Sequence, residues 1–358
     1  MSEPFEALPD LAVQTLGGGV VATNDEFFEA ADHLVLASAP VFSPRTFGLK
    51  GQVYDGWETR RRREPGHDWA IVRLGAPGVV HGVVVDTAFF TGNYPPFASV
   101  EASAVDGYPS GEELLAARWT TIVPRSSLKG DARNAFAVQT RDERLFTHVR
   151  LCIYPDGGVA RLRVHGRAVP DPRRLPDGVL DLAAIEHGAR VVGCSDMFYG
   201  SPMQLLMPGL ARVMGEGWET SRRRDAGNDW VIVELATPGR PLLAELDTSH
   251  FKGNAPAAAT LRGIDARVAD RDDESAWFSL LPRVGLQPDT RHRFGIETMA
   301  AGTAPGGSAA TATHVRLDIF PDGGMARLRL WGRLELEEIG RLTQRWRELL
   351  RAAANTAA

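Results

Sequence analysis

Asp55-Gly56-Trp57-Glu58-Thr59-Arg60-Arg61-Arg62-Arg63, continued by Gly66-His67-Asp68-Trp69, is the stretch that decides the fold, because the chain carries it twice. The second version reads Glu216-Gly217-Trp218-Glu219-Thr220-Ser221-Arg222-Arg223-Arg224 and continues with Gly227-Asn228-Asp229-Trp230. The offset between the versions is the same at the first Trp (218 − 57 = 161) and at the last (230 − 69 = 161). The chain is therefore predicted to be two copies of one domain. Residues that the copies share are expected to serve the fold, and residues that differ are candidates for a specialised site.

Further repeats indicate the type of secondary structure. Asp86-Thr87-Ala88-Phe89-Phe90-Thr91-Gly92-Asn93 matches Asp247–Asn254 at the same offset. Near the end of the first copy, apolar and polar residues alternate along 147–154 and 159–167, on either side of a Pro155-Asp156-Gly157-Gly158 turn that recurs at Pro321–Gly324. A period of two around such a turn predicts a hairpin with one buried and one solvent-facing side.

Short strands separated by turns predict an all-β protein of two tandem antiparallel β-sandwich or jelly-roll domains. We place the first repeat at residues 10–168, a Pro-rich linker at 169–178 and the second repeat at 179–334. Residues 335–358 differ, because Ile339, Leu342, Trp346 and Leu349 recur at helical spacing. This tail is predicted to be an amphipathic helix that packs on its own protein or on a neighbouring subunit.

Composition narrows the class of protein. The 358 residues are 44% hydrophobic and 24% charged, which is ordinary for a soluble globular protein. A net charge of −5 argues against nucleic acid or an anionic membrane as the main partner. No segment has the length of a membrane span, and the N-terminus has no secretory signal, so we expect a cytoplasmic protein. Cys152 and Cys194 do not correspond between the copies, which fits two reduced thiols.

The motifs divide into structural and functional candidates. Trp57, Trp69, Trp218 and Trp230 are interpreted as core anchors, because a buried Trp removes a large apolar area from water. The arginine runs allow two interpretations. They form a structural network with Asp68 or Asp86, and with their counterparts in the second copy, or they bind a substrate carboxylate with the two-pronged geometry of a guanidinium.

The differences between the copies suggest where a site has specialised. His250 and Lys252 replace Phe89 and Thr91, so that with Asp247 they give the second copy an acid–base set that the first lacks. The first copy has His67 where the second has Asn228. No metal-binding, phosphate-binding or nucleophile-elbow motif is present, so no cofactor is expected, although dependence on a divalent metal stays open.

In these motifs, above all Gly56–Arg63, Gly66–Trp69, Asp86–Asn93, Met214–Thr220 and Asp247–Asn254, the chain resembles the allantoicase family over nearly its whole length. The resemblance implies two jelly-roll domains of the galactose-binding-like type. It also implies hydrolysis of allantoate to ureidoglycolate and urea in allantoin and purine degradation. We expect allantoate as the small-molecule partner and a homo-oligomer as the assembly.

The chemistry of this reaction suggests roles for the shared and divergent residues. An arginine is suited to the carboxylate of allantoate, Asn and Glu to its ureido groups, and a His–carboxylate set to proton transfer. The predicted catalytic residues are His250, Asp247, Glu219, His67 and Asp86. The predicted substrate-binding residues are Arg222, Lys252, Asn254, Arg61, Glu58 and Asn93. Two alternatives are a non-catalytic lectin-like binding protein and a hydrolase of ureidoglycolate, and the sequence leaves open which copy holds the site.

Overall fold

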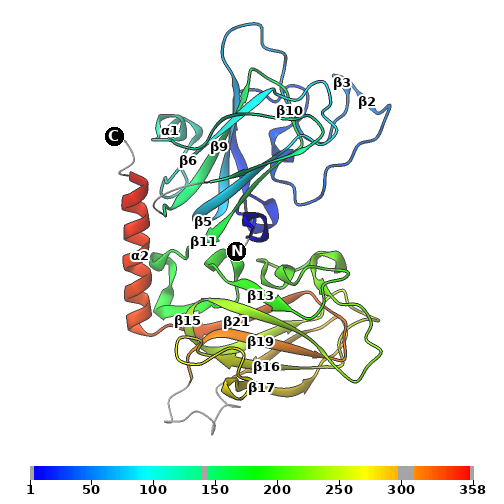
Figure 1. The fold of residues 1–358 in the computed structure, drawn as a ribbon, viewed down its shortest axis with the longest axis vertical. Helices are drawn as coiled ribbons and strands as arrows, with labels where there is room; N and C mark the ends of the chain where they lie inside the picture. Colours follow the sequence, from blue (N-terminus) through cyan, green and yellow to red (C-terminus); the bar gives the residue numbers. More distant parts are fainter. Residues whose placement is uncertain (1–3, 139–142, 297–309, 355–358) are drawn as a thin grey trace. The chain divides into compact units, whose positions relative to one another are not determined.

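The computed structural model describes residues 4–138, 143–296 and 310–354 (Figure 1). It divides into two compact units, Met1–Val169 with Arg345–Ala358, and Pro170–Gln344. Each unit is built mainly of antiparallel strands.

The first unit contains the strands of the first repeat and its short helices. Its strands are β1 (Gly19–Thr23), β2 (Phe47–Gly48), β3 (Gly51–Gln52), β4 (Trp57–Glu58), β5 (Asp68–Asp86), β6 (Phe97–Ser103), β7 (Thr120–Ser127), β8 (Arg133–Ala137), β9 (Phe146–Tyr154), β10 (Gly158–Val159) and β11 (Arg161–Ala168). Helix α1 covers Gly111–Ala116, and short 3₁₀ turns are η1 (Phe5–Ala7), η2 (Gln14–Leu16) and η3 (Ala31–Val35).

The second unit repeats this order. Its strands are β12 (Val179–Asp181), β13 (Arg190–Cys194), β14 (Trp218–Glu219), β15 (Asp229–Asp247), β16 (Ala258–Ile264), β17 (Phe278–Gly285), β18 (Arg291–Gly295), β19 (Ala312–Phe320), β20 (Gly324–Met325) and β21 (Arg327–Arg333). Its 3₁₀ turns are η4 (Pro172–Arg174), η5 (Pro176–Gly178), η6 (Ile185–His187), η7 (Pro202–Leu206), η8 (Met214–Glu216) and η9 (Glu274–Ala276). Helix α2 covers Leu336–Ala354.

One long bent strand organises each unit. The first part of β5 pairs with β1 and β9, and its second part pairs with β11 and β8. The change of partners falls between Arg73 and Gly78, where Pro77 interrupts the ladder because proline has no amide hydrogen to donate. In the second unit β15 makes the same change, with Pro238 at the matching place. Residues 68–86 therefore form one strand whose two parts pair with different strands.

The predicted hairpin between residues 147–154 and 159–167 is wrong in its pairing. Strand β9 pairs with β5 and β6, whereas β11 pairs with the other part of β5 (Figure 1). The turn between them carries β10, which pairs with β4. Alternation and turn residues identify two strands and a reversal, but they do not decide which layer each strand joins. Arg161 also departs from the predicted solvent-facing side, since it is 1% exposed and binds the backbone oxygen atoms of Ser38 and Asp55.

The tryptophans of the repeated motif have two different environments. Trp57 and Trp218 are fully buried, as predicted, and their indole Nε1 groups donate to the carbonyls of Asp25 and Asp196 at 2.7 and 2.9 Å. Trp69 and Trp230 are only half-buried, so their interpretation as core anchors is wrong. They are the second residues of β5 and β15, where one face of the strand is accessible to solvent.

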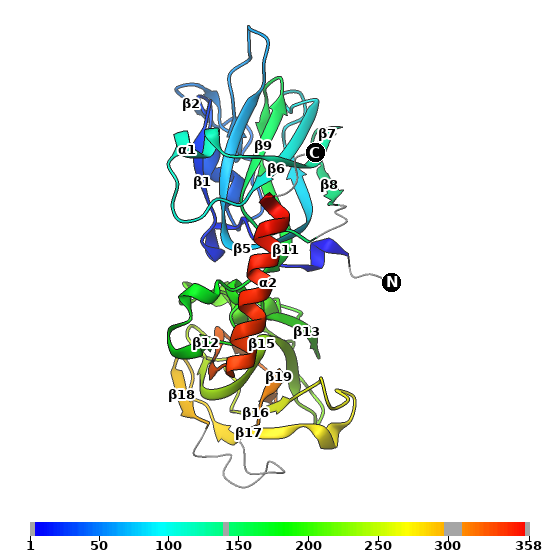
Figure 2. The same cartoon turned by 90° about the vertical axis from the view of Figure 1, so that its left-hand side faces the viewer.

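Helix α2, drawn in red in Figure 2, has the amphipathic character that its spacing predicts. In the first unit, Trp346 and Leu349 are buried in a cluster with Val79, Leu145 and Val169. In the second unit, Glu338 of the same helix accepts a hydrogen bond from Arg267 at 2.9 Å. The expected all-β architecture of two tandem sandwich domains and a C-terminal helix is confirmed.

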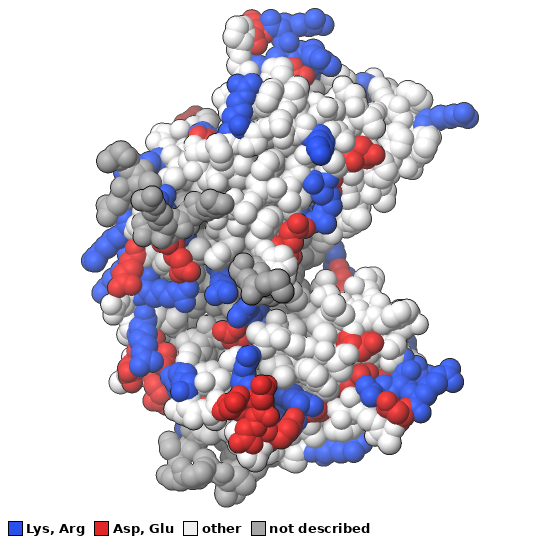
Figure 3. Space-filling view, viewed as in Figure 1, with Lys and Arg blue, Asp and Glu red and all other residues white. Residues whose placement is uncertain are grey.

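Basic and acidic side chains are interspersed on the face of the molecule that Figure 3 shows. Among the described residues, no helix is long and apolar enough to cross a membrane.

Candidate functional site

The repeated Trp-Glu dipeptide is fixed in the same way in both units. In the first, β4 pairs with β10 through Glu58–Gly158 and Trp57–Val159, and Glu58 also forms a bridge with Glu29. In the second, β14 pairs with β20, and Glu219 forms a bridge with Gly200. The Pro-Asp-Gly-Gly turn thus holds the Trp-Glu dipeptide by backbone hydrogen bonds, which explains why the two motifs recur together.

Each motif glutamate binds the asparagine that ends the second motif. Asn93 Nδ2 donates to Glu58 Oε1 at 2.7 Å, and Asn254 Nδ2 donates to Glu219 Oε1 at 2.6 Å. The other carboxylate oxygen of each glutamate has no hydrogen-bond partner among the described residues, and both side chains are half-buried. Burial raises the pKa of Glu58, and the neighbouring Glu29 adds to the effect. Glu58 and Glu219 thus each keep one carboxylate oxygen without a protein partner among the described residues, as does the buried Asp247 at Oδ2.

One arginine of each run is structural. Arg62 Nη1 lies 2.6 Å from Asp68 Oδ1, and Arg223 Nη1 lies 2.8 Å from Asp229 Oδ1. Both aspartates are 1% exposed. The network that the sequence proposes with Asp68 and its counterpart is therefore present.

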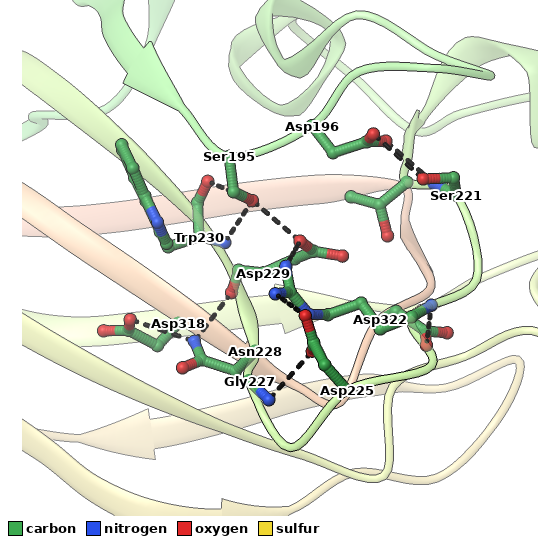
Figure 4. Close-up of polar contacts among 12 residues, drawn as sticks. Ser195, Asp196, Ser221, Asp225, Gly227, Asn228, Asp229, Trp230, Asp318 and Asp322 are labelled. Carbon is green, nitrogen blue, oxygen red and sulfur yellow. Dashed lines mark hydrogen bonds and ion pairs between the residues drawn. The ribbon is translucent and has the colours of Figure 1, made fainter.

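Further contacts hold Asp229 in place. In the second unit Ser195 Oγ donates to Asp229 Oδ1 at 2.9 Å, and Figure 4 shows the two side chains facing each other. The backbone amide of Arg223 donates to Asp322 of the Pro-Asp-Gly-Gly turn at 2.8 Å. These contacts bind the arginine segment to the turn.

The preceding arginines point away from this network. The side chain of Arg61 is 70% exposed, with its Nε 3.5 Å from Asp156 Oδ1. Arg222 is exposed and has no polar side-chain contact with any described residue. A guanidinium without a protein partner is free to bind an anion, so Arg222 keeps the predicted substrate-binding role as a hypothesis with a geometric basis.

Asp86 and Asp247 end the long strands and begin the second motif. Asp86 Oδ1 accepts from the Ala88 amide at 2.9 Å, and Asp247 Oδ1 accepts from the Ser249 amide at 2.8 Å. Asp247 is fully buried and Asp86 is 9% exposed. The observed contacts of both carboxylates thus organise the loop, and their predicted catalytic roles remain hypotheses.

Phe89 and His250 occupy the same strained backbone position. Their φ angles are 68° and 71°, in the left-handed region that residues with a side chain rarely adopt. The amides of both donate to an aspartate, Asp131 or Asp289, at 2.7 Å. The loop therefore presents one side chain at a fixed place in each unit, and His250 is the form that carries a titratable group.

The three residues of the predicted acid–base set, His250, Lys252 and Asp247, have separate polar partners. His250 Nε2 donates to the carbonyl of Ala211 at 2.9 Å, so a neutral His250 has its lone pair on Nδ1. The Lys252 side chain is 79% exposed and lies 3.7 Å from Asp289. His250, Lys252 and Asp247 share one loop, but no hydrogen bond or ion pair joins them to one another among the described residues.

His67 lies in a different environment, beside the sheet rather than on this loop. Its ring centre is 4.8 Å from that of Tyr154. Burial lowers the pKa of His67, and the Arg150 guanidinium lowers it further. Its counterpart Asn228 binds Asp318 at 3.1 Å (Figure 4).

Sequence reasoning missed a histidine next to the first motif. His33 Nδ1 lies 3.2 Å from Asp55 Oδ1, and Asp55 Oδ2 accepts from Arg161 Nη2 at 2.8 Å. Burial raises the pKa of Asp55, but hydrogen bonds from Arg161 and the Val41 amide outweigh it and lower the pKa. The only signal in the sequence is that His33 falls in the segment between two repeated motifs. Among the described residues, no group of histidine, cysteine, aspartate and glutamate side chains is arranged to hold a metal ion.

Comparison with known proteins gives a consistent result. A family model, the allantoicase repeat, matches residues 9–169 and 180–335. A probable allantoicase of Nocardia farcinica is 56% identical over 332 residues, which cover 92% of this chain and 95% of that protein. One from Pseudomonas aeruginosa is 45% identical and covers 93% and 98%. The crystal structure of allantoicase from Saccharomyces cerevisiae has a TM-score of 0.75 at 33% identity and covers 92% of this chain and 96% of that one.

Proposed function

Because this chain belongs to the allantoicase family, its reaction is the hydrolysis of allantoate to ureidoglycolate and urea, and we propose that the reaction takes place at the Glu–Asn clusters of the repeated motifs. The observation that carries the proposal is the pair Glu58–Asn93 and its counterpart Glu219–Asn254. In each pair one carboxylate oxygen is fixed by the amide and the other is available to a ligand.

The reaction specifies what these residues must do. One C–N bond between the central carbon of allantoate and a ureido nitrogen breaks, and the oxygen of water bonds to that carbon. The departing nitrogen takes up a proton and leaves as urea, while the attacking water gives one up. Proton delivery requires an acid whose proton is retained near neutral pH. We assign the role of proton donor to Glu58, because one of its carboxylate oxygens has no partner among the described residues and burial raises its pKa.

Substrate binding is assigned to the outward-facing arginines. We assign the binding of the allantoate carboxylate to Arg222, which has no polar partner among the described residues, and to Arg61, whose ion pair within the described part of the chain is with Asp156. Asn93 and Asn254 have amide groups that also suit a ureido arm. These assignments place a potential site in each unit.

The sequence-based assignment puts proton transfer in the second unit, at His250. The two hypotheses are separated by urea release from allantoate. If His250 is the acid or base, His250→Asn should lower kcat by about 10²–10⁴-fold and leave the melting temperature unchanged. If Glu58 is the acid, His250→Asn should keep most of its activity. Release of urea from ureidoglycolate but not from allantoate would contradict the assigned reaction.

The remaining expectations also belong to the proposal. We propose an enzyme without a cofactor, for which dialysis against a chelator should leave activity intact. We further propose a cytoplasmic location and a homo-oligomeric assembly. The assembly is supported by apolar side chains that each unit exposes, among them Phe47 (69%) and Leu49 (108%) in the first and Phe198 (71%) in the second. Light scattering of the purified protein would test the assembly, and a single-chain mass would contradict it.

A further inference from the structure

The second unit contains a cavity of about 340 Å³ that none of the motif residues lines. Its walls come from η6, from β12 and β21, and from the segments around residues 174 and 208. The residues that matter for its chemistry are Leu175, Asp181, Glu186, His187, Arg329 and Trp331.

Glu186 contributes a hydrogen-bond acceptor without a donor. Its Oε2 atom is buried and has no hydrogen-bond partner among the described residues. Burial raises the pKa of the Glu186 carboxyl, as it does that of Asp181. Burial of a carboxylate oxygen costs free energy unless a hydrogen-bond donor reaches it. The Glu186 Oε2 atom therefore indicates that the cavity lacks a donor, which a ligand could supply.

His187 contributes a second acceptor. Its Nδ1 donates to the carbonyl of Asp181 at 3.0 Å, which leaves the lone pair of a neutral imidazole on Nε2. The buried guanidinium of the cavity is already engaged by the protein. Arg329 donates to the carbonyls of Leu206 and Gly209 at 3.3 and 3.0 Å, and its Nε lies 3.7 Å from Asp181 Oδ2.

The first unit shows that the fold does not need these groups. The residues that correspond to Glu186 and His187 are Thr15 and Leu16. His165 stands in place of Trp331, and Phe5 of η1 covers it with ring centres 5.9 Å apart. The carboxylate of Glu186 and the imidazole of His187 therefore have no counterpart at the matching positions of the first unit, where Thr15 and Leu16 stand.

We propose that this cavity binds a small planar group rich in N–H donors, which Glu186 and His187 accept from and Trp331 stacks against. The charges of the lining favour a cation. The half-buried carboxylates of Asp181 and Glu186 line the cavity with one buried guanidinium, that of Arg329, while the exposed Arg174 has its Nε 3.4 Å from Asp171, which lies outside the cavity lining. A guanidinium or amidinium ion has the required shape, charge and donors, and its attraction to an indole face adds to the binding. Urea has the same planar donor geometry without the charge.

Calorimetric titration of the full-length protein tests this proposal. Methylguanidinium should bind once per chain, and Glu186→Gln should weaken it at least about tenfold because a charge-assisted hydrogen bond is lost. Glu234→Gln is the matched control, since Glu234 belongs to the same unit and pairs with Arg190 outside the cavity. Trp331→His, which introduces the residue of the first unit, should also weaken binding.

A second titration with urea distinguishes the two sources of this chemistry. If urea displaces methylguanidinium from the wild-type protein and binds more weakly to Glu186→Gln, the natural ligand is a ureide. If urea does not displace methylguanidinium, the natural ligand is a cation. Absence of methylguanidinium binding, or binding that Glu186→Gln does not change, would overturn the proposal. A crystal soaked with methylguanidinium provides a readout without substitutions, because the ion should lie between Glu186 and Trp331.

Discussion

Replacement of Glu58 by glutamine, with Glu219→Gln as its matched counterpart, tests the proposed mechanism directly. Glutamine keeps the shape of the side chain, and its carbonyl oxygen can still accept the hydrogen bond from Asn93 that is 2.7 Å long in the structure. The substitution therefore removes a titratable proton while it leaves the cluster assembled. The same argument applies to Glu219 and Asn254.

The expected loss follows from the role of a proton donor. General acid catalysis contributes about 10²–10⁴-fold to a rate, which corresponds to about 3–5 kcal/mol of transition-state stabilisation. We expect Glu58→Gln to lower kcat by this factor. Glu219→Gln makes the same change in the second unit, where Asn254 donates to Glu219 Oε1 at 2.6 Å, and its effect on kcat shows whether that cluster also takes part.

The raised pKa also has a consequence for stability. The folded pKa of Glu58 lies above its ordinary value of 4.5, so the folded state binds more protons than the unfolded state in the interval between the two values. The contribution of Glu58 to stability is complete below pH 4.5 and is lost as pH rises through the folded pKa. Glu58→Gln should remove this part of the pH dependence, which denaturant titrations at several pH values would measure.

Urea release from allantoate, measured for both variants alongside thermal melts, decides the outcome. Near-normal kcat in Glu58→Gln with an unchanged melting temperature would refute the assignment of Glu58. Loss of activity in Glu219→Gln alone would move the site to the second unit, and loss in both would indicate that each unit contributes.

The remaining predictions concern stability, substrate binding and acid sensitivity. Trp57→Ala and Trp218→Ala should each destabilise the protein by about 3–5 kcal/mol, because both side chains are fully buried, and unchanged melts would contradict this. Arg222→Lys should raise KM about 10–100-fold with little change in kcat, since a lysine cannot bind a carboxylate with two parallel hydrogen bonds; a fall in kcat alone would exclude the binding role. Burial lowers the pKa of His148 to about 4, so stability should fall as pH drops from 6.5 towards 4, and His148→Gln should flatten that slope in chemical denaturation.

The sequence predicts the repeat and the strand character well, and it fails on the pairing of strands. The sequence shows the repeat through the constant offset between the motifs. It shows the strands through the alternation of apolar residues, which reflects local strand geometry that any sandwich domain shares. Which layer a strand joins depends on the bend at Pro77 and Pro238, where one strand changes partners. The partner strands on either side of each proline come from distant parts of the sequence. The alternation of apolar and polar residues is the same whether the strand continues through the proline or ends there, so it does not predict the pairing.

Prediction of the candidate site is limited in a similar way, because the sequence identifies residues that recur but not every contact that they make. The repeat identifies both contacting pairs of the first unit, Glu58 with Asn93 and Arg62 with Asp68, because all four residues belong to motifs that recur in the second unit. The pairing of His33 with Asp55 is absent from the second unit, so the repeat contains no signal for it. Comparison of the copies identifies His250 as different, but it does not show that Nε2 is bound to the Ala211 carbonyl.

The arginine runs explain how one motif serves both fold and function. Successive side chains of an extended segment point to opposite sides. Arg62 and Arg223 therefore face inward to a buried aspartate, while Arg61 and Arg222 face solvent. The inner ion pair, together with the backbone hydrogen bond to the Pro-Asp-Gly-Gly turn, fixes the segment and so determines where the outer guanidinium stands. Under the proposed substrate binding by the outer arginines, we expect a substitution of the inner arginine to weaken that binding without any contact to the substrate. Arg62 and Arg223 then form the structural network, and the carboxylate clamp is the hypothesis that remains for Arg61 and Arg222.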